Sequence, residues 1–281
     1  MTHLSEAKHV LAQGEVLLVN ILEEARSVVV RLEVFVEELY QTKTSINSFN
    51  DIFDKKNIDL ETKTFLSEMT YNFQLQNDIY IEEFIALGGS THLMSLAVML
   101  DGSVLGYCLR AFYITTIYFN GVEFIRQRPE NVYKLYELLE KDDSTVKKNT
   151  LGILCSLLRD MKGAFSIINK VAVTHGFKKE RSPYSPLIDA LVLKDLDLKE
   201  RVLNFFNWMI FKCQNEEQCC KFQSRLENLG VYEECMRIHT KSNEKLRKQL
   251  MIFQQNCNIV IKSSMYELEI HKNRINQLER N

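Results

Sequence analysis

The sequence predicts an all-α protein, and three observations support that prediction. The chain of 281 residues contains only 10 Gly and 3 Pro, whereas a protein built from many strands needs frequent turn residues. Hydrophobic residues make up 46% of the chain, which is enough for a continuous core. Apolar residues recur at spacings of three and four, which is the period of a helix with one buried face.

The first predicted element is a long helix over residues 4–40, or a pair of helices interrupted at Gly14. It is acidic, because residues 1–40 hold seven Glu but only three Lys or Arg. The helical period places the apolar residues of this helix on roughly one face, which contains Leu18, Leu22, Val29, Leu32 and Val36.

A polar linker, TKTSINSFND, leads into a second predicted segment over residues 49–78. We expect this segment to form two short helices around the loop KKNID. Such a loop would place Lys55, Lys56 and Asn57 at an exposed tip.

The stretch CLRAFYITTIYFNGVEFI, residues 108–125, contains an Asn-Gly pair of the kind found in β-hairpins. The apolar positions before the pair are three and four residues apart, and the strict alternation of a hairpin strand is absent. Asn120-Gly121 is therefore expected to end a helix through a left-handed residue. A new helix is expected from Val122 to about Arg126.

The most informative feature of the chain is a recurring pair of helices. A short amphipathic segment, a polar break and a long helix follow one another four times. The first two copies are HLMSLAVML, DGS and VLGYCLRAFYITTIYF, and then NVYKLYELL, EKDDS and TVKKNTLGILCSLLR. The last two copies are YSPLIDALVL, KDLD and LKERVLNFFNWMIFK, and then VYEECMRIH, TKSN and EKLRKQLMIFQQN. Each break holds Asp, Ser, Thr or Asn, which are the residues that cap helix N-termini.

The spacing of these pairs indicates the kind of repeat. Ser103 and Ser144 lie 41 residues apart and Leu198 and Glu244 lie 46 apart, while residues 161–182 add another helix and a loop to the middle interval. A period near 40 residues with paired or triple helices is the armadillo/HEAT signature. Each unit exposes an apolar face that only its neighbours can bury, which predicts an armadillo-like right-handed solenoid. A chance recurrence of helix pairs in a helical protein is the alternative.

The C-terminal stretch has a possible coiled-coil register. Ile261, Leu268 and Ile275 are seven residues apart, and Leu278 follows three residues later. Leu268 and Ile275 would then form the seam of a homodimer. A solvated terminal helix is the alternative interpretation.

These elements give a predicted domain organisation. A helical extension over residues 1–45 precedes a small helical subdomain over residues 46–80. The repeat domain over residues 81–260 and a C-terminal helix over residues 261–281 follow.

Composition narrows the range of partners. The formal net charge is -2, so nucleic acid is not an expected partner. The start MTHLSEAKHV lacks the pattern of a secretory signal, and the longest apolar stretch, FIALGGSTHLMSLAVML, is too interrupted for a membrane span. Seven cysteines within helical patterns fit reduced, buried thiols in a cytosolic protein.

A catalytic set is not evident in the sequence. There is no Gly-rich phosphate loop and no C-x-x-C. Cys219, Cys220, Cys235 and His239 could be drawn as a zinc site, but their spacing matches no standard pattern and buried thiols explain them better. We therefore expect a non-enzymatic protein without catalytic residues, metal or cofactor.

Several motifs resemble those of a known family. GYCLRAFYITTIYFNGVEFI, RSPYSPLIDAL, LNFFNWMI, FQSRLENLGVYEECMRI and LRKQLMIFQQN resemble, in order, segments of the N-terminal regulatory region of diaphanous-related formins. FNDIFDKKNIDLETKTFLSEM is similar to the GTPase-binding segment of that family. The resemblance covers about residues 49–260.

The resemblance implies that the chain binds an active Rho-type GTPase, whose own GTP and Mg²⁺ would be the only nucleotide and metal involved. It also implies a cytoplasmic, cytoskeleton-associated regulator of actin assembly, which a C-terminal helix of the same protein would inhibit. The GTPase-binding residues it suggests are Lys55, Lys56, Asn57, Thr115, Thr116 and Asn120.

The groove for the autoinhibitory helix is expected at Ser156, Arg159, Asn204 and Asn207. Asn204 and Asn207 are three residues apart and so share one helix face. Arg159 departs from the family pattern, because it puts a charge where an apolar helix face would dock. The departure matters little if Arg159 pairs with Asp160 or points outward.

A second class of function fits the same fold. The solenoid could be an adaptor that binds peptides or helices without a GTPase. Dependence of binding on the nucleotide state of a GTPase would separate the two functions.

Overall fold

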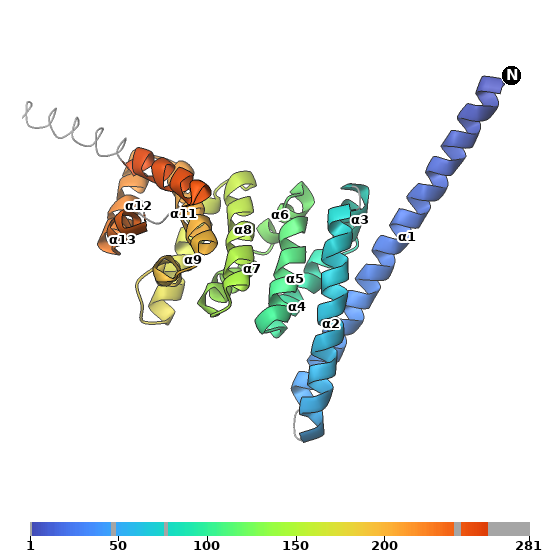
Figure 1. The fold of residues 1–281 in the computed structure, drawn as a ribbon, viewed down its shortest axis with the longest axis horizontal. Coiled ribbons are helices and arrows are strands. Elements are labelled where there is room, and N and C mark those ends of the chain that lie inside the picture. Colours follow the sequence, from blue (N-terminus) through green and yellow to red (C-terminus); the bar gives the residue numbers. More distant parts are fainter. Residues whose placement is uncertain (1, 46–48, 76–77, 239–242, 258–281) are drawn as a thin grey trace, which may run out of the picture. The chain divides into compact units, whose positions relative to one another are not determined.

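A computed structural model describes residues 2–45, 49–75, 78–238 and 243–257 (Figure 1). Apart from turns and caps, these residues are helical, as the sequence predicts. The chain divides into two compact units, Met1–Lys134 (unit 1) and Leu135–Asn281 (unit 2), which are described separately below.

Unit 1 contains six helices and the start of a seventh among its described residues. They are α1 (Thr2–Ser45), α2 (Phe49–Leu75), α3 (Asp78–Ala86), α4 (Gly89–Met99), α5 (Gly102–Thr115), α6 (Phe119–Arg126) and α7 (Glu130–Glu137), which crosses the unit boundary. Helix α1 packs on α3 and α4, and α2 packs on α5. The predicted extension and small subdomain therefore belong to one unit with the first repeat.

Helix α1 is a single helix that runs through Gly14, so the alternative of a helix pair is wrong. Its predicted face is partly correct, since Val29 and Leu32 are buried but Leu18 is 41% exposed. The buried face consists of Ile21, Ala25, Val29, Leu32, Phe35 and Leu39. The mean spacing of this face is 3.6 residues, the period of an α-helix, so the face stays directed at its neighbours over five turns.

Helix α2 is also continuous, which corrects the prediction of a KKNID loop. Residues 49–75 contain neither Gly nor Pro, so no residue in the segment forces the helix to break. The buried side chains Thr62, Phe65, Leu66, Met69 and Phe73 form its inner face. Phe65 stacks at 5.2 Å from Phe35 of α1, and Phe73 stacks edge-on against Phe84 of α3.

The Asn-Gly pair does not end a helix. Helix α5 ends at Thr115, and Asn120-Gly121 lies inside the first turn of α6. A Cβ atom on Gly121 would lie 2.0 Å from the carbonyl oxygen of Thr115. Glycine is therefore required there by the close approach of the two backbones and not by a left-handed conformation.

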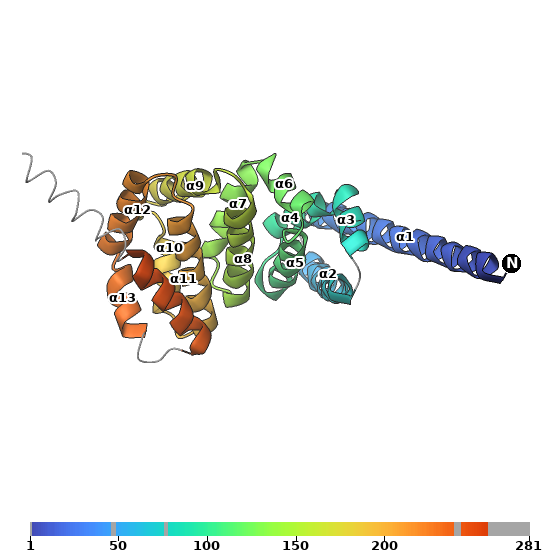
Figure 2. The same ribbon diagram turned by 90° about the horizontal axis from the view of Figure 1, so that it is seen from above.

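Unit 2 begins with the end of α7. Along the chain it repeats a pattern of short helices followed by one long helix. Its elements are η1 (Leu138–Glu140), α8 (Ser144–Asp160), α9 (Ala164–Lys178), α10 (Ser185–Val192), α11 (Leu196–Phe211), α12 (Glu216–Asn228), α13 (Val231–Ile238) and a helix over residues 244–257. The long helices α8 and α11 lie side by side in both views (Figures 1 and 2).

The predicted N-caps are present in the polar breaks of unit 2. The Asp143 carboxylate accepts the backbone N–H groups of Thr145 and Val146, and Asp195 does the same for Asp197 and Leu198. These bonds satisfy N–H groups that have no partner within the helix. The breaks therefore fix where α8 and α11 begin.

Neighbouring repeats of unit 2 are joined by an aromatic core and a buried ion pair. Tyr184 stacks edge-on against both Phe206 of α11 and Phe222 of α12. Lys199 of α11 lies 3.3 Å from the Glu234 carboxylate of α13 and also donates to the carbonyl oxygen of Leu191. These contacts hold α11 in register with the helices on either side.

Candidate partner-binding surfaces

A groove between α11 and the helix over residues 244–257 is the first candidate surface. It encloses about 290 Å³ and is lined by Asn204, Asn207, Trp208, Phe211, Gln249, Ile252 and Asn256. Its lining is neutral, with amides beside aromatic and aliphatic groups. Such a surface suits a partner segment that offers both backbone hydrogen bonds and apolar side chains.

Asn207 lines this groove, but its side-chain N–H groups already form hydrogen bonds within the protein. It is 6% exposed, and its Nδ2 donates to the carbonyl oxygen of Gln249 at 3.0 Å and to Gln249 Oε1 at 2.9 Å. Its Oδ1 is buried and has no hydrogen-bond partner among the described residues. Asn207 therefore links two helices and has little polar surface left for a ligand.

The other predicted groove residues differ in their accessibility. Asn204 is half-buried and lies 3.7 Å from the sulfur of Cys155 on α8. Ser156 is 3% exposed, and its hydroxyl donates to the carbonyl oxygen of Gly152 in its own helix. Ser156 is therefore a packing residue, which corrects its assignment to the groove.

Arg159 does not present an unpaired charge. Its guanidinium forms a forked contact with the Asp160 carboxylate, with Nε 2.9 Å from both oxygens. Arg159 and Asp160 are exposed at the end of α8. The pairing with Asp160 that the sequence left as an alternative is the one observed. The charge at this position, where the family pattern expects an apolar residue, therefore matters little for the docking of a helix.

The corner between α5 and α6 is the second candidate surface. Asn120 is exposed there, and it is flanked by Ile117 and Phe119, which are 54% and 74% exposed. Thr115 and Thr116 have no exposed surface, and their hydroxyls donate to carbonyl oxygens of α5 at 2.7 Å. The prediction that these two threonines contact a partner is therefore wrong.

The remaining predicted site residues are those of the tip and of the dimer seam. Lys55, Lys56 and Asn57 lie within helix α2 and not in a loop. The proposed dimer seam, Leu268 and Ile275, lies outside the described residues, as does His239 of the rejected zinc set. Among the residues that are described, no cluster of three His, Cys, Asp or Glu side chains is arranged to hold a metal ion.

Sequence reasoning missed the apolar members of both surfaces. Trp208 follows Asn204 by one helical turn and Phe211 follows Asn207 by one turn, so a helical plot of α11 would have placed them beside the amides. The helical spacing of apolar residues before Asn120 does not distinguish Ile117 and Phe119 from buried positions. Their exposure depends on where α5 ends, which the spacing does not show.

Residues 102–234 match the family model described as the FHOD1/3 FH3 domain. This part of the chain is therefore similar to a formin FH3 domain. This match extends from the start of α5 into α13, so it includes Asn120, Asn204 and Asn207 but not the segment around Lys55.

A curated relative agrees with the match, and solved structures show the fold. Formin-C of Dictyostelium discoideum is 25% identical over 214 residues, which are 72% of this chain and 18% of Formin-C. The designed armadillo repeat protein YIII(Dq.V1)4CPAF, solved in complex with peptide (KR)4, has a TM-score of 0.56 at 14% identity and covers 85% of this chain and 89% of its own. The designed protein YIII(Dq)4CqI gives 0.56 at 15% identity, with coverages of 85% and 90%. The armadillo-like all-α fold is therefore confirmed.

Within the described part of the chain, no helix is long and apolar enough to cross a membrane. The longest helix, α1, carries charged residues on most of its turns.

Proposed function

We propose that this FH3 chain is the regulatory module of a formin, that it binds a Rho-family GTPase in the GTP-bound state, and that it thereby controls actin filament assembly by the rest of the protein. The match of residues 102–234 to a formin FH3 domain supports the formin assignment. The chain spans less than a fifth of Formin-C, so actin assembly would belong to segments outside it. A cytoplasmic, cytoskeleton-associated location follows from the same proposal.

The observation that carries the proposal is the exposed corner between α5 and α6. Ile117 and Phe119 expose large apolar side chains on either side of a turn, and Asn120 offers an amide beside them. An aromatic anchor with a neighbouring polar group is typical of a protein–protein contact. A GTPase would be recognised in its GTP form because the γ-phosphate and Mg²⁺ hold its switch loops in an ordered conformation.

The test is binding of the chain to a panel of Rho-family GTPases, each loaded with GDP or with a non-hydrolysable GTP analogue. We expect binding of at least one GTP-analogue form and at least about tenfold weaker binding of its GDP form. Equal affinity for both nucleotide forms of every GTPase would contradict the proposal.

A variant with a matched control locates the contact. Phe119→Ser is expected to weaken GTPase binding by about tenfold or more, because it removes the apolar anchor. Phe177→Ser is the control, since Phe177 is 85% exposed in α9 and lies outside the corner. Equal loss in both variants would point to a general effect on the protein and not to a contact at Phe119.

The groove of α11 favours a second partner. Its amides and aromatic groups could hold an amphipathic helix from the C-terminal part of the same formin, which would provide autoinhibition.

The same groove supports the alternative function as an armadillo-type adaptor. A chain that binds a formin autoinhibitory peptide but no GTPase in either nucleotide state would favour the adaptor. Homodimerisation through Leu268 and Ile275 remains a prediction.

A further inference from the structure

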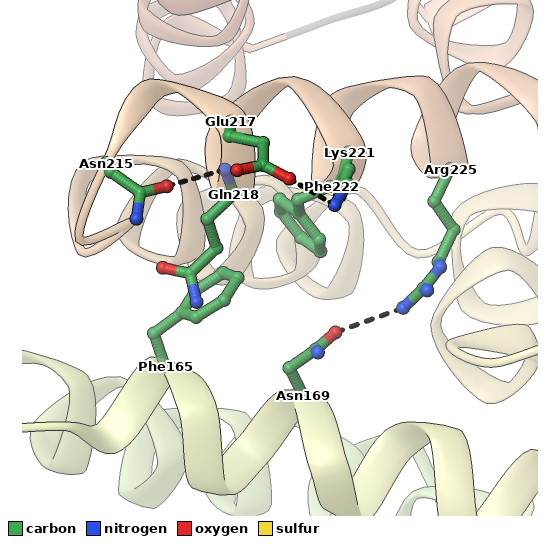
Figure 3. Close-up of a pocket in the computed structure, with 8 residues that line it drawn as sticks. All are labelled: Phe165, Asn169, Asn215, Glu217, Gln218, Lys221, Phe222 and Arg225. Carbon is green, nitrogen blue, oxygen red and sulfur yellow. Dashed lines mark hydrogen bonds and ion pairs between the residues drawn. The ribbon is translucent and has the colours of Figure 1, made fainter.

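A second pocket of unit 2 lies between α9 and α12 and shares no residue with the groove of α11. It encloses about 310 Å³ (Figure 3). Its lining residues are Phe165 and Asn169 of α9, with Asn215, Glu217, Gln218, Lys221, Phe222 and Arg225 at or within α12.

Arg225 is the charged residue at one end of this pocket. It is half-buried, and its Nη1 donates to Asn169 Oδ1 at 3.1 Å (Figure 3). The same Asn169 oxygen accepts the Tyr184 hydroxyl at 2.9 Å, so both of its lone pairs are used. In the described part of the chain, no carboxylate forms an ion pair with Arg225. The guanidinium therefore keeps its charge and most of its five N–H donors for a ligand.

The remaining lining residues define the chemistry of a ligand. Phe165 and Phe222 stack edge-on at 5.6 Å, and each is only 2% exposed, so they form the closed floor of the pocket. Gln218 accepts the backbone N–H of Gln214 through Oε1 at 2.7 Å, which leaves its amide N–H groups as donors.

The one carboxylate in the lining does not neutralise Arg225. Glu217 pairs with Lys221 one turn further along α12, and both side chains are 75% exposed. Figure 3 shows this pair on the α12 side of the pocket, while the guanidinium of Arg225 is directed at Asn169. The balance of charge in the lining is positive, and the N-terminus of α12 adds to it.

We propose that this pocket binds the carboxylate of a Glu or Asp side chain in a peptide partner. A guanidinium presents paired N–H groups whose spacing matches the two oxygens of a carboxylate. Gln218 supplies a further donor. The site is independent of the proposed GTPase contact, because its residues lie in α9 and α12 and not at the α5–α6 corner.

The experiment titrates the full ¹⁵N-labelled chain with three dipeptides, acetyl-Glu-Leu-amide, acetyl-Gln-Leu-amide and acetyl-phosphoserine-Leu-amide. The Glu peptide is expected to shift the Arg225 Nε–H and Gln218 side-chain resonances. The Gln peptide is expected to bind at least about tenfold more weakly, since it loses a charge-assisted pair. Equal binding of the Glu and Gln peptides, no binding of the Glu peptide, or tighter binding of the phosphoserine peptide would overturn the proposal.

Two variants connect binding to the guanidinium. Arg225→Lys keeps a positive charge but loses the fork, and it is expected to weaken the Glu peptide about tenfold. Arg237→Lys is the matched control, at an arginine of α13 that is 76% exposed and lies outside the pocket, and it is expected to leave the affinity unchanged. Unchanged affinity in Arg225→Lys would overturn the role of the fork. If Arg225→Lys does not fold, the comparison of Glu and Gln peptides on the parent chain still decides the proposal.

Discussion

The side-chain amide of Asn207 donates to Gln249 twice, to the backbone oxygen at 3.0 Å and to Oε1 at 2.9 Å. The two bonds connect α11 to the helix over residues 244–257, and Gln249 also lines the groove between them. The family resemblance assigns Asn207 to ligand contact, whereas the structure shows that it first holds the groove together.

The first prediction concerns this pair. Asn207→Asp is expected to lower the free energy of unfolding by about 2 kcal/mol, because it replaces a buried donor by an acceptor that faces two oxygens. Urea unfolding followed by the fluorescence of Trp208, the one tryptophan of the chain, measures the change. Asn204→Asp is the control and should cost less than about 1 kcal/mol, since Asn204 is half-buried and contacts a sulfur. Equal losses would show that the Gln249 bonds contribute nothing.

The second prediction concerns Arg159, whose charge is paired with Asp160. Arg159→Ala is expected to change the affinity for a formin autoinhibitory peptide by less than about threefold, because exposed ion pairs contribute at most about 1 kcal/mol. Calorimetric titration of the peptide into the parent and the variant measures it. A much tighter complex with the variant would mean that the guanidinium obstructs the groove despite its pairing.

The third prediction separates Thr115 and Thr116 from the GTPase contact. The double variant Thr115→Val with Thr116→Val is expected to bind a GTPase within about twofold of the parent, because both side chains are buried and bond only to their own helix. Surface plasmon resonance with an immobilised GTPase checks the affinity. A tenfold loss in a variant that unfolds at the parent's temperature would place these threonines at the interface after all.

The fourth prediction tests the buried pair of Lys199 and Glu234, whose side chains are 9% and 13% exposed. Lys199→Met is expected to destabilise unit 2 by about 2 kcal/mol, because Glu234 loses its buried partner and keeps only the exposed Arg237. The double variant Lys199→Met with Glu234→Gln should recover part of that loss. Denaturant unfolding measured at Trp208 gives both values. A double variant less stable than the single one would contradict this account.

The fifth prediction is a dependence of stability on pH. Burial opposes ionisation of Asp195, but hydrogen bonds from Lys148, Ser144 and the backbone N–H of Leu198 outweigh it and lower the pKa of Asp195 from 3.8 to about 2. A carboxylate with a depressed folded pKa contributes stability above its unfolded pKa and loses it as the pH falls. The stability of unit 2 should therefore decline between about pH 4 and pH 2.

Asp195→Asn is the variant that isolates this effect. It should be less stable than the parent at pH 7 and show a smaller decline between pH 4 and pH 2. Thermal unfolding measured across that range gives the comparison. An identical pH profile in the parent and the variant would exclude Asp195 as the titrating group.

The sequence by itself determined the local structure of this protein. The period of apolar residues, the N-caps Asp143 and Asp195 and the scarcity of Gly and Pro are local features, and helix formation responds to them directly. The recurrence of the helix pair then predicted an armadillo-like solenoid, which the comparisons confirm. The motifs also predicted a resemblance to formins, and the match of residues 102–234 to an FH3 domain confirms that resemblance.

Only the tertiary structure decided which side chains are accessible. Thr115, Thr116 and Ser156 are buried because neighbouring helices cover their faces, whereas Phe119 is exposed because α5 ends early at Thr115. Gly121 is explained by a backbone contact, and Asn207 by a partner that lies 42 residues further along the chain. Helical spacing places residues on a face, but the packing of distant segments decides whether that face meets solvent, a partner or another helix.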